Sequence, residues 1–573
     1  MYCNFCFRTL ELFLFLSLKA MTKENINWVI IIFAILIVVF LWNNYRQKKR
    51  IQKFKDYLIS SWGKQIKNRY YNFYSISKYF ENTFNRNNSF HIIDNATAND
   101  LDIDDLFKYI DRTSSKIGQQ YLYYKLRTIQ FTENLKEFDK LTNLFENDVN
   151  LRLLCQLKLS KLNTHSAYDF ETLINEKPIE KPNYLKYLSV LSFISLISIF
   201  ASFFKIGFIL ILLPVFALNI VFHYKNKQNV NYYLSGVGQL LSTLKVSKLL
   251  SKQAKIKPFF KDLSFLDKVQ EIRMNSEFIS FDNKFDNPFA VVLWLFIEII
   301  KIQFNVGTIL FYKFIDGIYN EKESLDKMFQ FIGKIDSAIA IASVKYGNNQ
   351  ICKPQFTTDK LLKAKEIYHP LIENCITNTI ELNHKSLLLT GSNMSGKTTF
   401  IRTIAINTIL AQTMNIAFAK EFKIPFLKVF SSIKISDDLL NDTSYYLKEV
   451  QTIKKFIEES KGNTPCLFVL DEIFKGTNTI ERISGGKAIL SYLNLKNHFV
   501  LVSTHDIELT DLLKNKAYDL YHFTEIIIDN KLIFDHKLKQ GKLLTRNAIK
   551  ILELNNYPKE IIIDAKKVEK DNF

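Results

Sequence analysis

The stretch LLLTGSNMSGKTTF, Leu387 to Phe400, passes from an apolar run into a glycine-bounded loop that ends in Gly-Lys-Thr. It fits the pattern G-x-x-x-x-G-K-[ST] of phosphate-binding loops. The spacing predicts a strand over Ser386–Thr390 and a helix from Thr398 to about Thr413. In this arrangement, backbone N–H groups and the positive end of the helix dipole face a phosphate. Lys397 is expected to reach the β- and γ-phosphates, and Thr398 to bind Mg²⁺.

Two later stretches carry the polar residues that a phosphate loop needs. CLFVLDEIFKGTNT (Cys466 to Thr479) begins with an apolar run typical of a strand buried on both faces of a parallel sheet. Asp471 at its end would hold Mg²⁺ through water, and Glu472 would polarise the attacking water. FVLVSTHDIELTDLL (Phe499 to Leu513) predicts another buried strand. It is followed by His505, which is placed to contact the γ-phosphate or to orient water.

Together these motifs resemble those of the MutS family, the DNA mismatch-repair ATPases. The family's TGPNMGGKST is matched here by TGSNMSGKTT, its DEIGRGTST by DEIFKGTNT, and its ATHYxELT by STHDIELT. Upstream, YHPLIE (Tyr368 to Glu373) is similar to the family's R-H-P entry into this domain. SDDLLNDTSYYLKEV (Ser436 to Val450) resembles a family segment whose serine reaches across a dimer to the partner's nucleotide. Ser444 holds the matching position, and Asp442 stands where the family has glycine.

The resemblance implies ATP and Mg²⁺ as cofactors and a homodimer formed through the ATPase domain. It assigns catalysis to Lys397, Glu472 and His505, and the metal to Thr398 and Asp471. The residues expected to bind the nucleotide are Gly391, Ser392, Asn393, Met394, Ser395, Gly396, Lys397, Thr398, Thr399 and Ser444.

The resemblance continues outside the ATPase. Asp105 to Arg127 looks like the opening of the family's core helical domain, and Phe331 to Gly347 like the end of its lever helices. His536 to Ala565 resembles closing helices that help two ATPases pair. The resemblance therefore implies an α/β P-loop ATPase (ABC-like, with a parallel sheet core) at the C-terminus, preceded by an all-α core and lever domain. The apolar segments described next add transmembrane helices to that expected fold. The family's mismatch-reading domain, with its Phe-x-Glu, finds no match.

Three uncharged segments are apolar enough to predict membrane spans. Ile26 to Trp42 has a tryptophan near each end and is followed by YRQKKR, which places that end in the cytoplasm. Tyr187 to Phe204 and Ile206 to Phe222 are separated by Lys205 alone and flanked by lysines, which predicts a tight hairpin with both outer ends cytoplasmic. The alternative is a hairpin buried in a protein core. Phe289 to Ile300 is too short and carries Glu298, which indicates a buried or amphipathic helix.

Composition adds weaker constraints. The chain has 573 residues, and its 76 Lys and Arg against 57 Asp and Glu give a formal charge of +19. That balance suits nucleic acid or an anionic membrane leaflet, although a lysine-rich compositional bias would produce it too. The 6 cysteines are scattered, which indicates a reducing compartment without a disulfide framework.

These observations predict a domain layout. It runs as follows: 1–20, a signal-like leader or a start misassigned ahead of Met21; 21–50, a transmembrane helix and basic flank; 51–94, a basic linker; 95–350, the helical domain with the hairpin 187–222; 351–573, the ATPase with C-terminal dimerisation helices.

Two functions from different classes follow. The first is a multi-pass protein of the cytoplasmic membrane with a cytoplasmic MutS-like ATPase that binds double-stranded DNA in an ATP-dependent way, in mismatch repair or recombination control. The second keeps the ATPase but uses it to remodel the membrane or a partner protein without DNA. A nucleotide-driven transporter is less favoured, because three spans are too few for a pore unless several copies assemble.

Overall fold

The computed structural model describes residues 23–82, 86, 89–175, 180–276, 297–392, 394–434, 445–514, 516–528, 531–543, 548–554 and 557–572. The described residues fall into two compact units, with the boundary between Trp62 and Gly63. The leader expected over residues 1–20 lies outside the described part of the chain.

The first unit contains one long helix, α2 (Lys23–Ser60, 38 residues). The predicted span from Ile26 to Trp42 and the basic stretch after it belong to this single helix. Trp28 and Trp42, at the two ends of the predicted span, are both exposed, as interfacial anchors would be.

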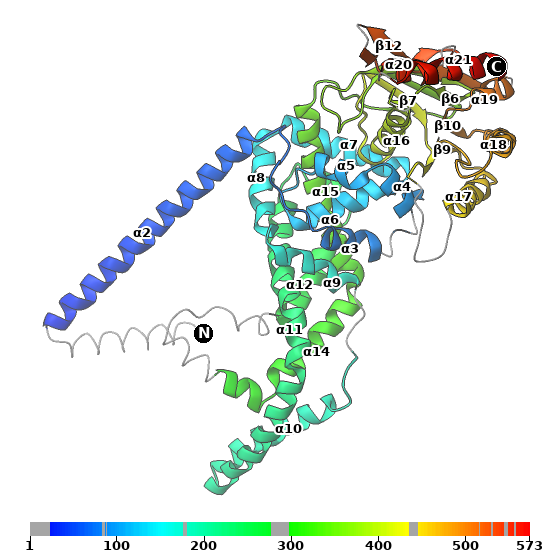
Figure 1. Ribbon diagram of the computed structural model, residues 1–573. Coiled ribbons are helices and arrows are strands. Elements are labelled where there is room, and N and C mark those ends of the chain that lie inside the picture. The colour runs from blue at the N-terminus through cyan, green and yellow to red at the C-terminus, as the bar shows by residue number, and fades with distance from the viewer. Residues whose placement is uncertain are drawn as a thin grey trace. The chain divides into compact units, whose positions relative to one another are not determined.

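The second unit begins with a helical part, followed by sheets (Figure 1). Its helices are α3 (Phe73–Asn82), α4 (Asn95–Asp100), α5 (Ile103–Ile110), α6 (Lys116–Arg127), α7 (Thr132–Asn147), α8 (Val149–Leu159), α9 (Phe170–Asn175), α10 (Leu185–Ser202), α11 (Leu212–Ser251), α12 (Phe265–Ser276), α14 (Val306–Asn320) and α15 (Lys322–Gly347). Short 3₁₀ helices lie at η2 (Ser160–Leu162), η3 (His165–Asp169), η4 (Ile206–Ile211) and η5 (Lys257–Phe259). A two-stranded ribbon pairs β1 (His91–Ile92) with β2 (Thr128–Ile129).

The segment expected to be a basic linker, 51–94, differs from that prediction. It contains the end of α2 and all of α3, and α3 packs against α6. Tyr79 of α3 is fully buried, stacks on Phe329 with ring centroids 3.9 Å apart, and donates a hydrogen bond to Asp326 Oδ1 at 2.7 Å. The apolar periodicity of FYSISKYF, masked by the surrounding lysines, makes this stretch part of the helical core.

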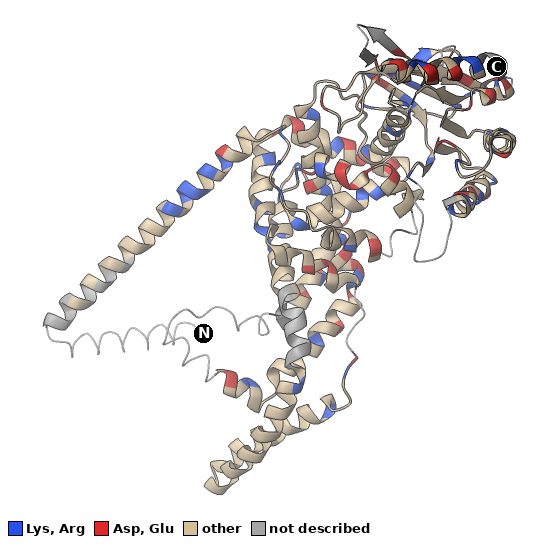
Figure 2. Cartoon of the chain, in the orientation of Figure 1, with Lys and Arg blue, Asp and Glu red and all other residues tan. Residues whose placement is uncertain are grey.

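The predicted hairpin consists of α10, η4 and the first part of α11. Two segments are long and apolar enough to cross a membrane by length and composition, Leu185–Ser202 and Ile206–Asn226, and most of their surface is exposed. Charged residues are sparse along α10 in Figure 2. Whereas the sequence predicted a third span ending at Phe222, α11 continues without a break to Ser251 and reaches α9, α12 and α15.

The C-terminal part holds a six-stranded sheet in the order β14-β11-β6-β10-β9-β8 and a four-stranded sheet in the order β3-β7-β4-β5. The strands are β3 (Gln355–Thr357), β4 (Leu361–Ile367), β5 (Asn378–Asn383), β6 (Ser386–Thr390), β7 (Glu421–Pro425), β8 (Lys428–Ser432), β9 (Cys466–Asp471), β10 (Phe499–Thr504), β11 (Tyr518–His522) and β14 (Lys539–Gln540). A separate hairpin pairs β12 (Glu525–Ile528) with β13 (Lys531–Phe534). The helices of this part are α16 (Lys397–Met414), α17 (Tyr445–Ser460), α18 (Thr479–Leu493), α19 (Glu508–Leu513), α20 (Ala548–Leu554) and α21 (Lys559–Asn572).

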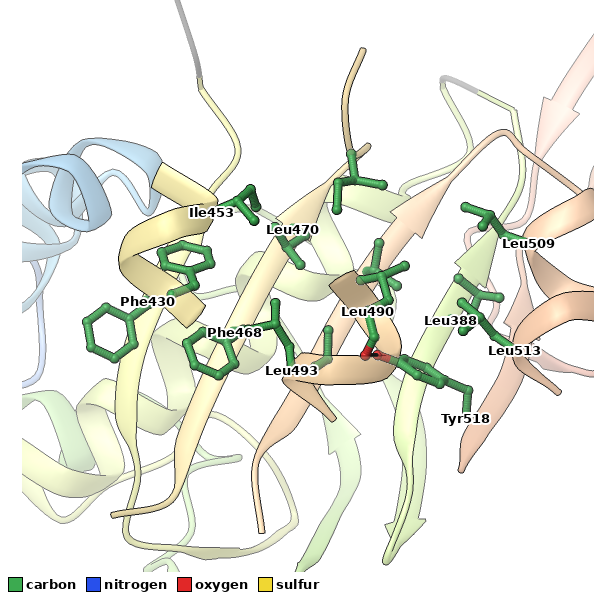
Figure 3. Close-up of a cluster of buried hydrophobic side chains, with 14 of the residues drawn as sticks. Leu388, Phe430, Ile453, Phe468, Leu470, Leu490, Leu493, Leu509, Leu513 and Tyr518 are labelled. Atoms are coloured by element: carbon green, nitrogen blue, oxygen red, sulfur yellow. Dashed lines mark hydrogen bonds between the residues drawn. The ribbon is translucent and has the colours of Figure 1, made fainter. Parts of the chain in front are cut away.

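The central strands of the six-stranded sheet are buried on both faces. Strands β11, β6, β10, β9 and β8 are mutually parallel, as the continuous apolar runs predicted. Leu388, Phe468 and Leu470 point to the face covered by α17, α18 and α19, where they join one apolar cluster (Figure 3). Alternate residues such as Leu389 and Val469 point to the opposite face, where α16 contacts β9 and β10.

The helical and sheet parts contact each other beside the phosphate loop and at the end of β8. Helix α16 packs against α6 and α7. Asp100, at the end of α4, accepts hydrogen bonds from Ser431 Oγ at 2.7 Å, from Ile433 N at 2.7 Å and from Lys434 N at 2.9 Å, which caps the end of β8. The helical part therefore contacts both the helix that follows the phosphate loop and the strand that leads to residues 435–444.

Candidate nucleotide site

The phosphate-loop strand and helix lie where the sequence predicted them. β6 spans Ser386–Thr390, and α16 begins at Lys397. Gly391 and Gly396 have φ angles of 148° and 107°, which an L side chain rarely adopts. A Cβ on Gly391 would also lie 2.8 Å from Ser395 Oγ and 2.9 Å from Phe523 O. Both glycines are thus needed for the loop to turn into the helix.

Lys397 is held at the mouth of the loop. Its Nζ donates to Gly391 O at 2.7 Å and to Ser392 O at 3.0 Å, and it lies 3.1 Å from His505 Nε2. Burial lowers the pKa of Lys397 to about 8, although Asp471 and Glu472 act in the opposite direction. The ammonium is therefore partly desolvated and oriented by backbone carbonyls, a suitable state for meeting a phosphate anion.

Asp471 links the loop to two strands. Thr398 Oγ1 donates to Asp471 Oδ2 at 2.8 Å, and Ser503 Oγ donates to Asp471 Oδ1. The three residues come from α16, β9 and β10, and they meet because parallel strands end at the same edge of the sheet. The hydroxyl and the carboxylate predicted to serve the metal are thus adjacent.

Glu472 follows β9 in a left-handed conformation, with a φ of 58°. A non-glycine residue there is uncommon and often marks a functional turn. Its backbone N–H donates to Ser503 O at 2.8 Å, and its carboxylate lies 3.3 Å from His505 Nε2 and 3.2 Å from Lys475 Nζ. Burial and Lys397 lower the pKa of His505, which keeps the ring neutral near pH 7. The structure therefore brings Lys397, Asp471, Glu472 and His505 together, as predicted.

Glu449 is a buried acid for which the sequence motifs predict no role. It lies in α17, is 1% exposed, and its Oε1 accepts a hydrogen bond from Phe474 N. Burial raises the pKa of this carboxyl group. Phe474 also has a positive φ, 57°, so Glu449 fixes the turn that follows Glu472. The sequence signal for it is its place at the end of the segment that begins at Ser436.

A cavity of about 450 Å³ opens beside the phosphate loop. Its lining combines the loop and α16 with the segment after β4 and two later residues, Phe523 and His536. His536 Nδ1 donates to Ser395 O at 3.0 Å, and Asn378 Nδ2 donates to His536 O at 3.0 Å, which together hold the ring in place. Tyr368 lines the same cavity. An apolar, partly aromatic cavity next to a phosphate loop is suited to a nucleoside.

The remaining predicted residues are divided between the site and its surroundings. Ser392 Oγ donates to Glu525 Oε2 at 3.0 Å, and Ser395 Oγ, which is buried, donates to Ser392 O at 2.7 Å. Met394 is exposed, and both Met394 and Thr399 line the cavity. Asn393 and Ser444 lie outside the described residues.

The donor set fits Mg²⁺ only as a partner of a bound phosphate. Within the described ranges, no three His, Cys, Asp or Glu side chains gather as a metal site would require. Thr398 and Asp471 supply one hydroxyl and one carboxylate. Because Mg²⁺ prefers few protein ligands together with phosphate oxygens and water, this pair suits it.

A phosphate-loop strand flanked by strands that end in a histidine and in a carboxylate pair defines the C-terminal part as an α/β domain of the phosphate-loop type. The profile of MutS domain V matches residues 387–571. Over these residues the chain is therefore similar to MutS domain V.

Curated relatives carry the name DNA mismatch repair protein MutS. The chain is 32% identical to the protein of Listeria welshimeri over 257 residues, covering 43% of this chain and 30% of the relative. It is 32% identical to the protein of Pseudothermotoga lettingae over 255 residues (42% and 31%) and 30% identical to that of Staphylococcus epidermidis over 270 residues (45% and 31%). The matches thus span less than a third of the length of these relatives.

Proposed function

We propose that this protein is a membrane-anchored ATP hydrolase of the MutS type. The observation that carries the proposal is the convergence of Lys397, Thr398, Asp471, Glu472 and His505 at one edge of a parallel sheet. These residues come from three motifs spread over more than a hundred positions. A shared edge is what phosphoryl transfer requires, since it depends on positioning and on charge stabilisation.

Each residue has a role that its contacts support. Lys397 would bind the β- and γ-phosphates, and Thr398 and Asp471 would hold Mg²⁺, which would neutralise phosphate charge. Glu472 accepts a proton from the attacking water, and the contact between Glu472 and His505 at 3.3 Å orients both side chains. The cavity between Tyr368 and His536 takes the base and ribose.

A dimer would complete the site. Ser444, at the position that resembles the family's trans-acting serine, would reach the partner's nucleotide. Helices α20 and α21, which contact each other, lie mostly in the segment that resembles the family's pairing helices. ATP binding would close two such domains, and hydrolysis would reopen them.

The membrane location rests on exposed apolar surface. Side chains such as Phe193, Phe200 and Leu213 of the hairpin are more than half exposed. Soluble proteins rarely expose contiguous apolar patches of this kind. With the lysines at its outer ends, the hairpin suits a cytoplasmic membrane, with the ATPase in the cytoplasm.

We propose double-stranded DNA as the target on which the ATPase acts, because the relatives are named for DNA mismatch repair. The second candidate is a membrane or protein target. It is favoured by α11, a continuous 40-residue helix that joins the hairpin to the helical part.

One experiment tests both candidates. ATP hydrolysis by the full chain in detergent is measured alone, with homoduplex, with mismatched duplex and with branched DNA, at two salt concentrations. Stimulation that weakens with salt would support DNA. Absence of both DNA binding and stimulation would reject DNA in favour of the membrane target. Lys397→Ala is the control and should abolish nucleotide binding and hydrolysis; an unchanged rate would refute the proposed site.

A further inference from the structure

Helix α14 is fixed to the hairpin at a break in a helix. Residues 297–303 are helical, and the chain turns at Phe304 and Asn305, where Asn305 has a φ of 51°. Ser192 Oγ of α10 donates to Phe304 O at 2.6 Å, and Asn219 Nδ2 of α11 donates to Gln303 O at 2.8 Å. Carbonyl groups released by a helix break need such partners when water is excluded. The start of α14 is therefore held against both arms of the hairpin.

A cavity of about 430 Å³ lies between α14 and the beginning of α10. Its polar lining includes Lys181, Lys186, Ser189, Tyr312, Lys313 and Asp316. Lys181 pairs with Asp316 at 2.6 Å, which leaves two positive charges in excess among the lining residues. Lysine ammonium groups bind phosphate as compact point charges. The cavity is therefore suited to an anion of about the size of a phosphate ester.

The surface beside the cavity is apolar. Tyr187, Val190 and Phe193, on the first turns of α10, are 65%, 55% and 63% exposed. These residues begin the segment that is long and apolar enough to cross a membrane. A ligand that places an anionic group in the cavity would thus lay any attached chain along α10.

We propose that this cavity binds the headgroup of an anionic phospholipid, with its acyl chains along α10. The inference rests on the proposed membrane location and assigns a ligand to the cytoplasmic end of the hairpin. Basic pockets between membrane helices on this side are suited to anionic headgroups. The two excess positive charges favour a headgroup with a net negative charge. A zwitterionic headgroup carries an ammonium group of its own, which the lysines would repel.

The test is a lipid titration of the full chain in detergent, followed by native mass spectrometry. Phosphatidylglycerol and phosphatidylcholine with the same acyl chains are compared. We expect phosphatidylglycerol to bind at least tenfold more tightly than phosphatidylcholine. Lys186→Gln with Lys313→Gln should abolish that preference. Lys205→Gln with Lys252→Gln removes the same charge from exposed positions between the two arms of the hairpin and directly after α11, and should preserve that preference. Equal lipid selectivity in the two double variants would overturn the proposal.

Competitors separate the sources of the phosphate. Inorganic phosphate at about 10 mM should not displace the lipid, because it lacks the acyl chains that would lie along α10. Displacement by phosphate or by a short DNA duplex would overturn the lipid assignment in favour of those anions. ATP hydrolysis is measured in the same samples. A protein that stays monodisperse without detergent and binds neither lipid refutes the membrane location, whereas equal binding of both lipids refutes the headgroup site alone.

Discussion

Lys397 makes nucleotide affinity sensitive to pH. Its pKa is lowered to about 8, so the folded protein begins to lose this proton near that pH, whereas an ordinary lysine keeps it to above 10. Phosphate favours the charged ammonium, so binding must take up a proton at higher pH. We expect the Kd for ATP to be constant below about pH 7.5 and to rise up to tenfold per pH unit well above pH 8, about 1.4 kcal/mol per unit. Calorimetric titrations from pH 7 to 9.5 measure it.

The control for this prediction is Lys360, another buried lysine whose pKa is lowered to about 8. Its Nζ donates to Asn494 Oδ1 at 2.9 Å, and it is not among the residues that line the nucleotide cavity. Lys360→Gln should leave the pH profile of ATP binding unchanged. If the pH profile of ATP binding became flat in Lys360→Gln, the proton uptake would belong to Lys360 and the prediction for Lys397 would be wrong.

Glu472 is expected to act in hydrolysis and not in binding. Glu472→Gln keeps the size of the side chain but removes the base, so the hydrolysis rate should fall about 10²- to 10⁴-fold. The Kd for ATP should change by less than about threefold, because Lys397 and Thr398 hold the phosphates. The variant should therefore accumulate as an ATP-bound dimer, which light scattering detects. Normal turnover would remove Glu472 from this role.

The site could be predicted from sequence only where its residues lie in local motifs. Lys397 begins α16, Asp471 ends β9 and His505 directly follows β10, so each lies in a short motif that the sequence and its resemblance to the MutS family could mark. His536 and Glu525 reach the loop through the β12–β13 hairpin and the segment after it, far along the chain. No short pattern marks them, because tertiary packing and not local spacing brings them to the site.

At the scale of elements, the close contact between α6 and α15 depends on glycine. A Cβ on Gly333 of α15 would lie 2.3 Å from Tyr121 Cβ, too close for any real contact. Gly333→Ala should therefore lower the unfolding free energy by about 1 to 3 kcal/mol, as overpacking does. The shift in thermal unfolding temperature of the full chain in detergent measures it.

The matched control is Gly238 of α11, where an added Cβ would meet nothing within 4 Å. Gly238→Ala should raise the unfolding temperature, because alanine in a helix interior is favoured over glycine by about 1 kcal/mol. Equal effects of the two substitutions would mean that helix propensity, and not the contact with α6, decides the outcome.

The sequence predicted element types better than element lengths. The apolar strands β6, β9 and β10 were found because both of their faces are buried, which leaves an uninterrupted apolar run. The length of α11 was missed because its apolar first half and polar second half read as different environments. The backbone hydrogen bonds of a helix continue unbroken where its sequence changes from apolar to polar. The change in composition within α11 therefore does not mark the end of the helix.

At the scale of the whole molecule, packed helices connect the nucleotide site to the hairpin. α16 follows the phosphate loop and contacts α6 and α7, both of which pack on α15. α15 in turn contacts α11, which runs into the hairpin. A change at the loop would therefore reach the hairpin through rigid elements in direct contact. Such contiguity permits coupling, and a two-state change in one of these helices would establish it.

The hairpin can be tested apart from α2, because residues 63–573 form a compact unit of their own. We expect a protein of residues 63–573 to bind ATP as the full chain does, to stay in the membrane pellet after alkaline carbonate washing, and to need detergent to be monodisperse. The physical reason is the exposed apolar surface of α10 and of the first part of α11.

The matched variant carries Phe193→Glu, Ile197→Glu and Phe200→Glu, three exposed positions on one face of α10. Each charge at the centre of a bilayer costs about 2.5 to 3.5 kcal/mol, so the variant should move to the soluble fraction while keeping ATP binding. If the unsubstituted 63–573 protein is already soluble and monodisperse without detergent, the apolar face of the hairpin does not lie in a membrane and is available to a protein partner. The nucleotide cycle would then act through a partner docked on that apolar face, and α11 would be its lever.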